Sequence, residues 1–316
     1  MRALFLDNEV RLRRDYPDPR PVSGESLIKV EMAGICGTDL ELARGYMSYR
    51  GIPGHEFVGR VIESGRAEVI GRRVVGEINA ACGRCEWCDR GLGRHCPNRT
   101  VLGILGRDGA FAEHLTLPDE NLLPVPDSIP NESAVFCEPL AAAYEIFEQT
   151  HIQPTESIAI LGDGRLGSLI AMALKAERLP SVIAGHNRSR LDRIAALGLK
   201  VSLESELKPG FDLVIDATGR AEGFNRALEL VRPRGRVILK STAAASAPLN
   251  PAPAVINEIT IIGSRCGCFG PALEALASGR VDPRPLISGI YPLEDGIAAI
   301  RAATNRSNFK VLLRAA

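Results

Sequence analysis

The segment from Ser157 to Ala176 reads S-I-A-I-L-G-D-G-R-L-G-S-L-I-A-M-A-L-K-A and indicates the fold of a large part of the chain. Ile158 to Leu161 form a short apolar run typical of a buried strand, and Ser168 to Ala176 has helical character. Between them lie Gly162, Gly164 and Gly167, spaced for a tight turn whose backbone amides can approach a pyrophosphate at a helix N-terminus. This context predicts a dinucleotide-binding turn, which would include Arg165 and Leu166. The alternative is the same fold without a dinucleotide.

Four further apolar runs follow this unit, separated by helical or loop stretches. They are S-V-I-A (181–184), F-D-L-V-I-D-A-T-G (211–219), G-R-V-I-L-K-S-T (235–242) and E-I-T-I-I-G-S (258–264). Strands that alternate with helices predict an α/β fold with a parallel, doubly wound sheet of the Rossmann type.

The end of the second apolar run carries the signal for the kind of nucleotide. An NAD site typically has an acidic residue there, which binds the ribose 2′-hydroxyl. This chain has Gly185 at that position. His186, Asn187 and Arg188, helped by Arg190, could then pair with a 2′-phosphate. We therefore predict NADP(H) rather than NAD(H); the alternative is that these residues form a solvated basic loop.

Length and charge limit the remaining possibilities. A chain of 316 residues suggests about two domains. Lys and Arg together number 38, as do Asp and Glu, so no global charge favours nucleic acid or anionic membranes. No apolar run approaches the ~20 residues that span a bilayer. The first ten residues have no hydrophobic signal region, so we expect a cytoplasmic protein with reduced thiols.

Four cysteines lie within fifteen residues in the pattern C-x2-C-x2-C-x7-C, at Cys82, Cys85, Cys88 and Cys96. In a reducing compartment such thiols favour a metal over disulfides. Four thiolates close a tetrahedron and leave no open position, so we predict a structural zinc site in a surface loop. A [4Fe–4S] cluster or four unligated cysteines are the alternatives.

A second group of metal-binding side chains lies in glycine-flanked turns at strand ends. Cys36 occurs in A-G-I-C-G-T-D, and His55 and Glu56 occur in G-I-P-G-H-E-F-V-G. One sulfur, one imidazole and one carboxylate leave zinc open to a further ligand. The segment A-V-F-C-E-P-L offers Cys137 or Glu138 as a third ligand.

These motifs, in this order across nearly the whole chain, resemble the medium-chain, zinc-dependent alcohol and polyol dehydrogenases. The resemblance implies two zinc ions per chain, with Glu138 preferred over Cys137 as the third ligand of the catalytic ion. Glu56 would be a weak fourth ligand or a group behind the ligands, or else the ion-pair partner of a buried arginine. Residues 1–135 and 269–316 would form a β-rich, partly barrel-like catalytic domain of the GroES-like type. Residues 136–268 would form the Rossmann domain, with the active site between the two.

The resemblance also implies a reaction. Zinc would act as a Lewis acid on the substrate oxygen while hydride passes between the nicotinamide and an alcohol, polyol or sugar, or the matching carbonyl. We expect Thr38 to relay the proton, unless it is a plain turn residue. Glu41 stands where the family often has a histidine and could continue the relay. Ser241, Arg265 and Lys310 would lie near the pyrophosphate or nicotinamide, or Arg265 and Lys310 would have ordinary surface roles.

Two questions stay open at this stage. The substrate is a small alcohol or carbonyl whose identity the motifs do not give. A retired relative that binds cofactor without turnover, as a redox sensor or assembly partner, is the alternative to an enzyme. The run 258–264 is apolar and would be an exposed edge in a monomer, so we expect a homo-oligomer, a dimer or tetramer.

Overall fold

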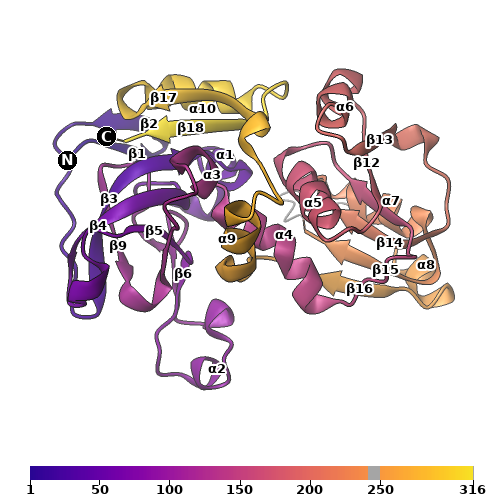
Figure 1. Ribbon diagram of the computed structural model, residues 1–316, viewed down its shortest axis with the longest axis horizontal. Helices are drawn as coiled ribbons and strands as arrows, with labels where there is room; N and C mark the ends of the chain where they lie inside the picture. The colour runs from indigo at the N-terminus through magenta and orange to yellow at the C-terminus, as the bar shows by residue number, and fades with distance from the viewer. Residues whose placement is uncertain (241–249, 316) are drawn as a thin grey trace. The chain divides into compact units, whose positions relative to one another are not determined.

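The structure is a computed structural model that describes residues 1–240 and 250–315. The chain divides into two compact units, one made of Met1–Glu138 and Ala272–Ala316 and the other of Pro139–Pro271 (Figure 1). The second unit is therefore an insertion in the sequence of the first. The boundaries expected from the sequence lie within three residues of these.

The first unit is built on an open sheet of seven described strands. Its order is β10-β5-β4-β3-β18-β17, and β9 pairs with β3 beside this path. The bounds are β3 (Glu25–Gly34), β4 (Glu56–Ser64), β5 (Arg73–Gly76), β9 (His114–Pro118), β10 (Leu122–Pro124), β17 (Ile287–Pro292) and β18 (Lys310–Arg314). Strand β18 comes from the end of the chain and lies against β3 near its beginning. A residue near position 310 can therefore contact residues of the first sixty.

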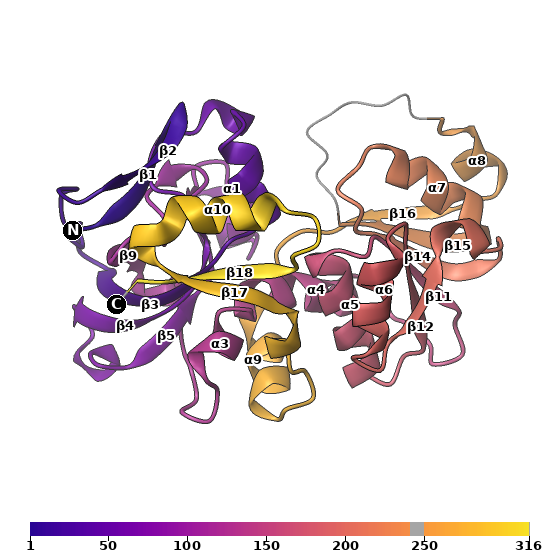
Figure 2. The same ribbon diagram turned by 90° about the horizontal axis from the view of Figure 1, so that it is seen from above.

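Helices and a hairpin cover this sheet. Helix α10 (Gly296–Thr304) packs along β17 and β18 (Figure 2). The hairpin is β1 (Ala3–Asp7) with β2 (Glu9–Arg13). Three further helices belong wholly or partly to this unit: α1 (Gly37–Leu42), α3 (Asn131–Ala134) and α9 (Phe269–Ala277), the last of which begins in the second unit.

A small sheet carries the cysteine-rich loop. Its strands are β6 (Asn79–Ala80), β7 (Thr100–Leu102) and β8 (Gly106–Arg107). The loop between β6 and β7 holds the short helix α2 (Glu86–Asp89) and projects from the rest of the first unit (Figure 1). A projecting loop of this kind has little apolar core of its own, so its shape must come from the four cysteines.

The second unit is a parallel sheet of six described strands in the order β13-β12-β11-β14-β15-β16. Their bounds are β11 (Ile158–Leu161), β12 (Ser181–Gly185), β13 (Lys200–Leu203), β14 (Phe211–Asp216), β15 (Val231–Leu239) and β16 (Thr260–Gly263). Every neighbouring pair runs parallel. The predicted Rossmann fold is confirmed. Strand β13 was not among the predicted runs, because K-V-S-L is short and only half apolar.

Helices lie on both faces of this sheet. Helices α5 (Arg165–Ala176) and α6 (Arg188–Ala195) cover one face, and α7 (Glu222–Leu230) and α8 (Ala252–Ile256) cover the other (Figure 2). Helix α4 (Cys137–Gln149) leads into the unit. All four residues of β11 are buried, as expected for a strand covered on both sides. Strand β11 begins and ends where the sequence predicted, whereas α5 starts three residues earlier than the expected Ser168.

Candidate active site

Strand pairing brings Cys36, His55 and Glu56 together. Antiparallel β3 and β4 pair so that Gly34, at the end of β3, lies opposite Glu56, at the start of β4. Cys36 follows β3 as the residue before α1, and His55 immediately precedes β4. One ligand atom from each of Cys36, His55 and Glu56 lies within 4.8 Å of the other two. A sulfur, a ring nitrogen and a carboxylate oxygen at such distances fit zinc without rearrangement of the backbone.

Asp39, which sequence reasoning missed, supports this group from behind. Its carboxylate accepts hydrogen bonds from the backbone N–H of Cys36 (2.7 Å) and of Gly54 (3.2 Å). It also lies 3.3 Å from Nδ1 of His55, and both side chains are buried. Burial lowers the pKa of His55, but the charges of Asp39 and Cys36 outweigh it and raise the pKa well above its usual value. Asp39 thus holds the turn and the imidazole together, a common role of carboxylates behind metal ligands.

Glu56 has a second partner, Lys310 from β18. The two charged groups form an ion pair with side-chain exposures of 1% and 3%. The ammonium also lies 5.7 Å from the ring centroid of Phe136. A side chain at Gly34 would collide with the Glu56 carboxylate and the end of Lys310, so glycine makes room for the pair. The alternative considered for Glu56 was an ion pair with a buried arginine; the structure has an ion pair with a lysine.

This placement corrects the expectation for Lys310. The sequence suggested a cofactor phosphate, the nicotinamide or the protein surface as its surroundings. The structure instead buries Lys310 in the first unit against Glu56, because β18 pairs with β3. The surface role is therefore wrong, whereas a place near the pyrophosphate or the nicotinamide stays a prediction.

Glu138, the expected third ligand, lies in the first turn of α4 and outside the group of three. The pKa of Glu138 is raised to about 7, mainly by burial; the charges of His55 and Lys310 oppose this rise, and the carboxylates of Glu56 and Glu77 add to it. The charges of His55 and Glu56, two members of the ligand group, therefore act on the carboxyl group of Glu138. Its neighbour Cys137 is fully buried, and burial raises the pKa of that thiol well above its ordinary value. The choice of Glu138 over Cys137 stays a prediction.

The two residues expected in a proton relay have different surroundings. The hydroxyl of Thr38 lies 4.0 Å from the sulfur of Cys36, next to the ligand group. Glu41 points away: its carboxylate lies 2.5 Å from Arg44, and its side chain is 41% exposed. The structure therefore gives a relay through Thr38 a better starting point than one through Glu41.

The four cysteines of the projecting loop converge as the spacing predicted. Sulfur–sulfur distances are 3.5 Å for Cys85–Cys88 and Cys82–Cys96, 3.7 Å for Cys85–Cys96 and 4.0 Å for Cys82–Cys88. Four thiolates at about 2.3 Å from one tetrahedral zinc would lie about 3.8 Å apart. A disulfide would need about 2.05 Å. The arrangement fits one tetrahedral ion and excludes disulfides in this state.

The glycine turn of the second unit is shaped for a pyrophosphate. A Cβ on Gly162 would lie 2.6 Å from the carbonyl oxygen of Ala217, and one on Gly167 would collide with the carbonyl oxygen of Gly162, so both glycines are required by packing. A Cβ on Gly164 would have only Arg190 nearby, at 3.8 Å. The protein itself therefore leaves space over Gly164, immediately before Arg165 and Leu166 at the start of α5. A phosphate at this helix N-terminus fits that space.

The residues after β12 lie at the surface. His186 and Arg188 have side-chain exposures of 67% and 69%, and Asn187 caps α6 by accepting a hydrogen bond from the backbone N–H of Arg190 at 3.1 Å. Arg265 is exposed, and its carbonyl oxygen accepts a hydrogen bond from the buried Lys240. Ser241 lies outside the described residues.

Comparison with known proteins agrees with this fold and these sites. Residues 22–127 match the alcohol dehydrogenase GroES-like domain, and residues 166–278 match the zinc-binding dehydrogenase family. L-threonine 3-dehydrogenase of Streptomyces avermitilis is 30% identical over 95% of this chain and 94% of its own. An Escherichia coli CFT073 alcohol dehydrogenase solved with NADH has a TM-score of 0.91 at 25% identity, with 99% of both chains covered. A zinc-binding dehydrogenase from Sinorhizobium meliloti 1021 solved with NADP has a TM-score of 0.89 at 26% identity, covering 99% of this chain and 98% of the other.

The chain belongs to the family of medium-chain, zinc-dependent alcohol and polyol dehydrogenases. It is a zinc-dependent oxidoreductase that uses a nicotinamide cofactor and acts on a small alcohol or polyol, or on the matching carbonyl. The same observations argue against the alternative of a related protein that binds the cofactor without turnover. Among the helices that the structure describes, none is long and apolar enough to span a membrane.

Proposed function

We propose that Cys36, His55 and Glu138 hold the catalytic zinc, with Glu56 as an exchangeable fourth group, and that the four loop cysteines hold a second, structural zinc. The observation that carries the proposal is the convergence within 4.8 Å of the thiol of Cys36, the imidazole of His55 and the carboxylate of Glu56, which is itself paired with the buried Lys310. Glu138 would have to approach this group, and its electrostatic coupling to His55 supports such an approach. Zinc bound there would supply a Lewis acid for the substrate C–O bond.

The chain's own groups would do the remaining work. The hydroxyl of Thr38 would accept a hydrogen bond from the substrate hydroxyl and pass its proton onward, as its position beside Cys36 allows. Asp39 would keep the imidazole of His55 oriented. Lys310 would neutralise Glu56 when that carboxylate does not contact the ion. The turn from Gly162 to Gly167 would bind the pyrophosphate of the nucleotide.

Metal analysis tests the two-zinc proposal. We expect two zinc ions per wild-type chain and one in each of Cys36→Ser and Cys88→Ser. Turnover should disappear in the first variant and persist at moderate temperature in the second, because only the first removes a group from the reaction site. One zinc in the wild type, or loss of both ions in either variant, would contradict two independent sites.

The two candidates for the third ligand can be separated in the same way. Glu138→Gln should lower zinc content at the catalytic site, whereas Cys137→Ser should leave it unchanged. The reverse result would assign the ligand to Cys137. Glu132→Gln, on the preceding helix α3, is a control for the loss of one carboxylate.

The cofactor and the substrate are identified by one screen. NADP(H) was predicted because Gly185 carries no carboxylate, yet the side chain of Asp163 packs against Gly185 in the structure. Primary and secondary alcohols, polyols and sugar acids should therefore be tested with NAD⁺ and NADP⁺ side by side. Absence of turnover with every substrate, in protein of full zinc content, would contradict the proposed reaction.

We also propose that the protein is a homodimer paired through β16. This strand ends the order of the parallel sheet, and Ile261 on it is 41% exposed. Val255 and Ile256 on α8 are each 77% exposed. Apolar side chains beside an open strand edge favour pairing with a second copy. Ile261→Lys should shift the mass measured by light scattering from dimer to monomer; a monomeric wild type would reject the proposal.

A further inference from the structure

Asp163 lies between the first two glycines of the nucleotide turn, and its side chain extends to the end of β12. A Cβ built on Gly185 would lie 2.5 Å from the Cβ of Asp163 and would collide with its carboxylate. The side chain of Asp163 therefore occupies the space that a side chain at position 185 would fill. The structure places a carboxylate at the strand end where the sequence showed only glycine.

Two groups hold this carboxylate in place. The backbone N–H of Asn187 donates a hydrogen bond to Oδ2 of Asp163 at 3.3 Å. The guanidinium of Arg190 has its Nε 3.8 Å from Oδ1, and the two side chains are only 14% and 18% exposed. Arg190 also approaches Gly164 at 3.8 Å, so it lies along the turn. One hydrogen bond and one charge–charge contact thus favour this position of the carboxylate.

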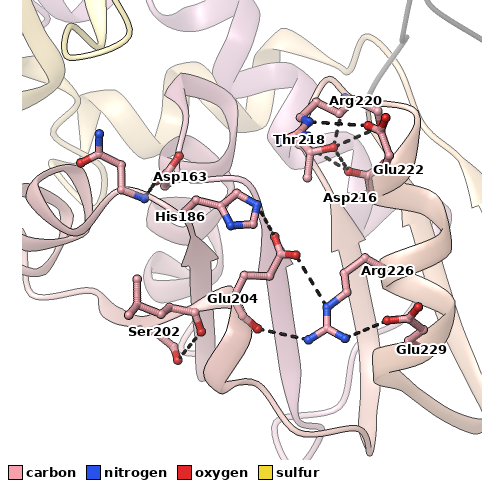
Figure 3. Close-up of polar contacts among 12 residues, drawn as sticks. Asp163, His186, Ser202, Glu204, Asp216, Thr218, Arg220, Glu222, Arg226 and Glu229 are labelled. Carbon is pink, nitrogen blue, oxygen red and sulfur yellow. Dashed lines mark hydrogen bonds and ion pairs between the residues drawn. The ribbon is translucent and has the colours of Figure 1, made fainter.

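The cations that suggested a 2′-phosphate site have carboxylate partners. Nε2 of His186 lies 3.2 Å from Glu204, and Glu204 in turn faces Arg226 (Figure 3). Nε of Arg188 lies 3.4 Å from Asp192. Arg190 faces Asp163 as described. A 2′-phosphate would therefore be repelled by the negative charge of Asp163. The nearby basic side chains already have carboxylate partners and would attract it less.

We propose that Asp163 replaces the missing strand-end acid and makes the enzyme prefer NAD(H). Its carboxylate would accept hydrogen bonds from the ribose hydroxyls of the adenosine half, and it would repel the 2′-phosphate of NADP(H). Arg190 is a positioning residue that keeps the carboxylate turned toward the strand end. The inference rests on the proposed binding of a nicotinamide nucleotide by this turn, and it reverses the preference that the sequence suggested.

Binding measurements test the proposal without turnover. The affinities of NADH and NADPH follow from nucleotide fluorescence, and those of ADP-ribose and its 2′-phosphate from calorimetry, all at one ionic strength. We expect the wild type to bind NADH at least about tenfold more tightly than NADPH. Asp163→Asn keeps the shape of the side chain and removes its charge. It should reduce the ratio of NADH affinity to NADPH affinity about tenfold. Arg190→Lys should keep most of the preference, and Arg190→Ala should reduce it.

Glu148→Gln is the matched control, because it removes one carboxylate from an exposed position on α4 and should leave the ratio unchanged. A wild type that binds NADPH more tightly would overturn the proposal, as would an Asp163→Asn variant with an unaltered ratio. A selective loss of NADPH affinity in Arg188→Ala would instead support the 2′-phosphate site that the sequence predicted at this loop, and it would also count against the role proposed for Asp163. If neither nucleotide binds, the proposed function is wrong, and the proposal about Asp163 is wrong with it. If both nucleotides bind but no alcohol is turned over, only the proposed class of substrate is wrong.

Discussion

Replacing Lys310 with methionine leaves the carboxylate of Glu56 buried without its cation. The pair joins residues 254 positions apart, and both side chains are almost fully shielded from water. Removing one partner of a buried ion pair costs roughly 3–5 kcal/mol, because the remaining charge is desolvated and uncompensated. This is a large part of the ~5–15 kcal/mol that holds a typical protein folded. For domains of 150–250 residues it corresponds to a melting temperature lower by roughly 6–20 °C.

A double-mutant cycle measures this coupling. Lys310→Met and Glu56→Gln should each destabilise the first unit, and the double variant should recover much of the loss, because neither charge is then left alone. Lys310→Arg keeps the charge and is the control for loss of the cation. Urea unfolding followed by circular dichroism gives the stabilities, and hydrogen exchange in peptides from β4 and β18 locates the effect in the first unit.

The result that refutes this reasoning is additivity. If the double variant is destabilised by the sum of the two single effects, Glu56 and Lys310 do not depend on each other for stability. Faster exchange confined to the second unit would likewise show that the substitutions act elsewhere.

Three further predictions concern the ligand group of the first unit and one hydrogen-bonded carboxylate of the second. Asp39→Asn should weaken zinc binding at the catalytic site about 10–100-fold, since ligand-orienting carboxylates typically contribute that much; competition with a chelator measures this, and unchanged affinity would contradict the role of Asp39. Thr38→Val should lower turnover while zinc content and cofactor affinity stay the same, and equal turnover would reject the relay. Asp212, whose pKa is lowered to about 2 by hydrogen bonds from Ser157 and Arg232, should stabilise the folded state above about pH 4 and lose this contribution as pH falls toward 2. Asp212→Asn should therefore lower the melting temperature at pH 7 and have little effect near pH 2.

Much of the fold could be predicted from local patterns. The run I-A-I-L before the glycine turn gave the strand β11 with its correct ends, and the turn identified the Rossmann unit around it. The spacing C-x2-C-x2-C-x7-C brought four sulfurs together as expected. Strand β13 was missed, because its four residues do not stand out from the neighbouring loop.

The sequence by itself predicted the four-cysteine loop and the glycine turn, since short spacings bring near neighbours together whatever the rest of the chain does. Only the tertiary structure decided which distant group each would face. The pairing of β18 with β3 buries Lys310 beside Glu56, and Asp163 reaches Gly185 only because β11 and β12 are adjacent parallel strands. Partners across strands depend on register and topology, and spacing along the chain does not encode these; for that reason the strand-end charge could not be inferred from position 185 alone.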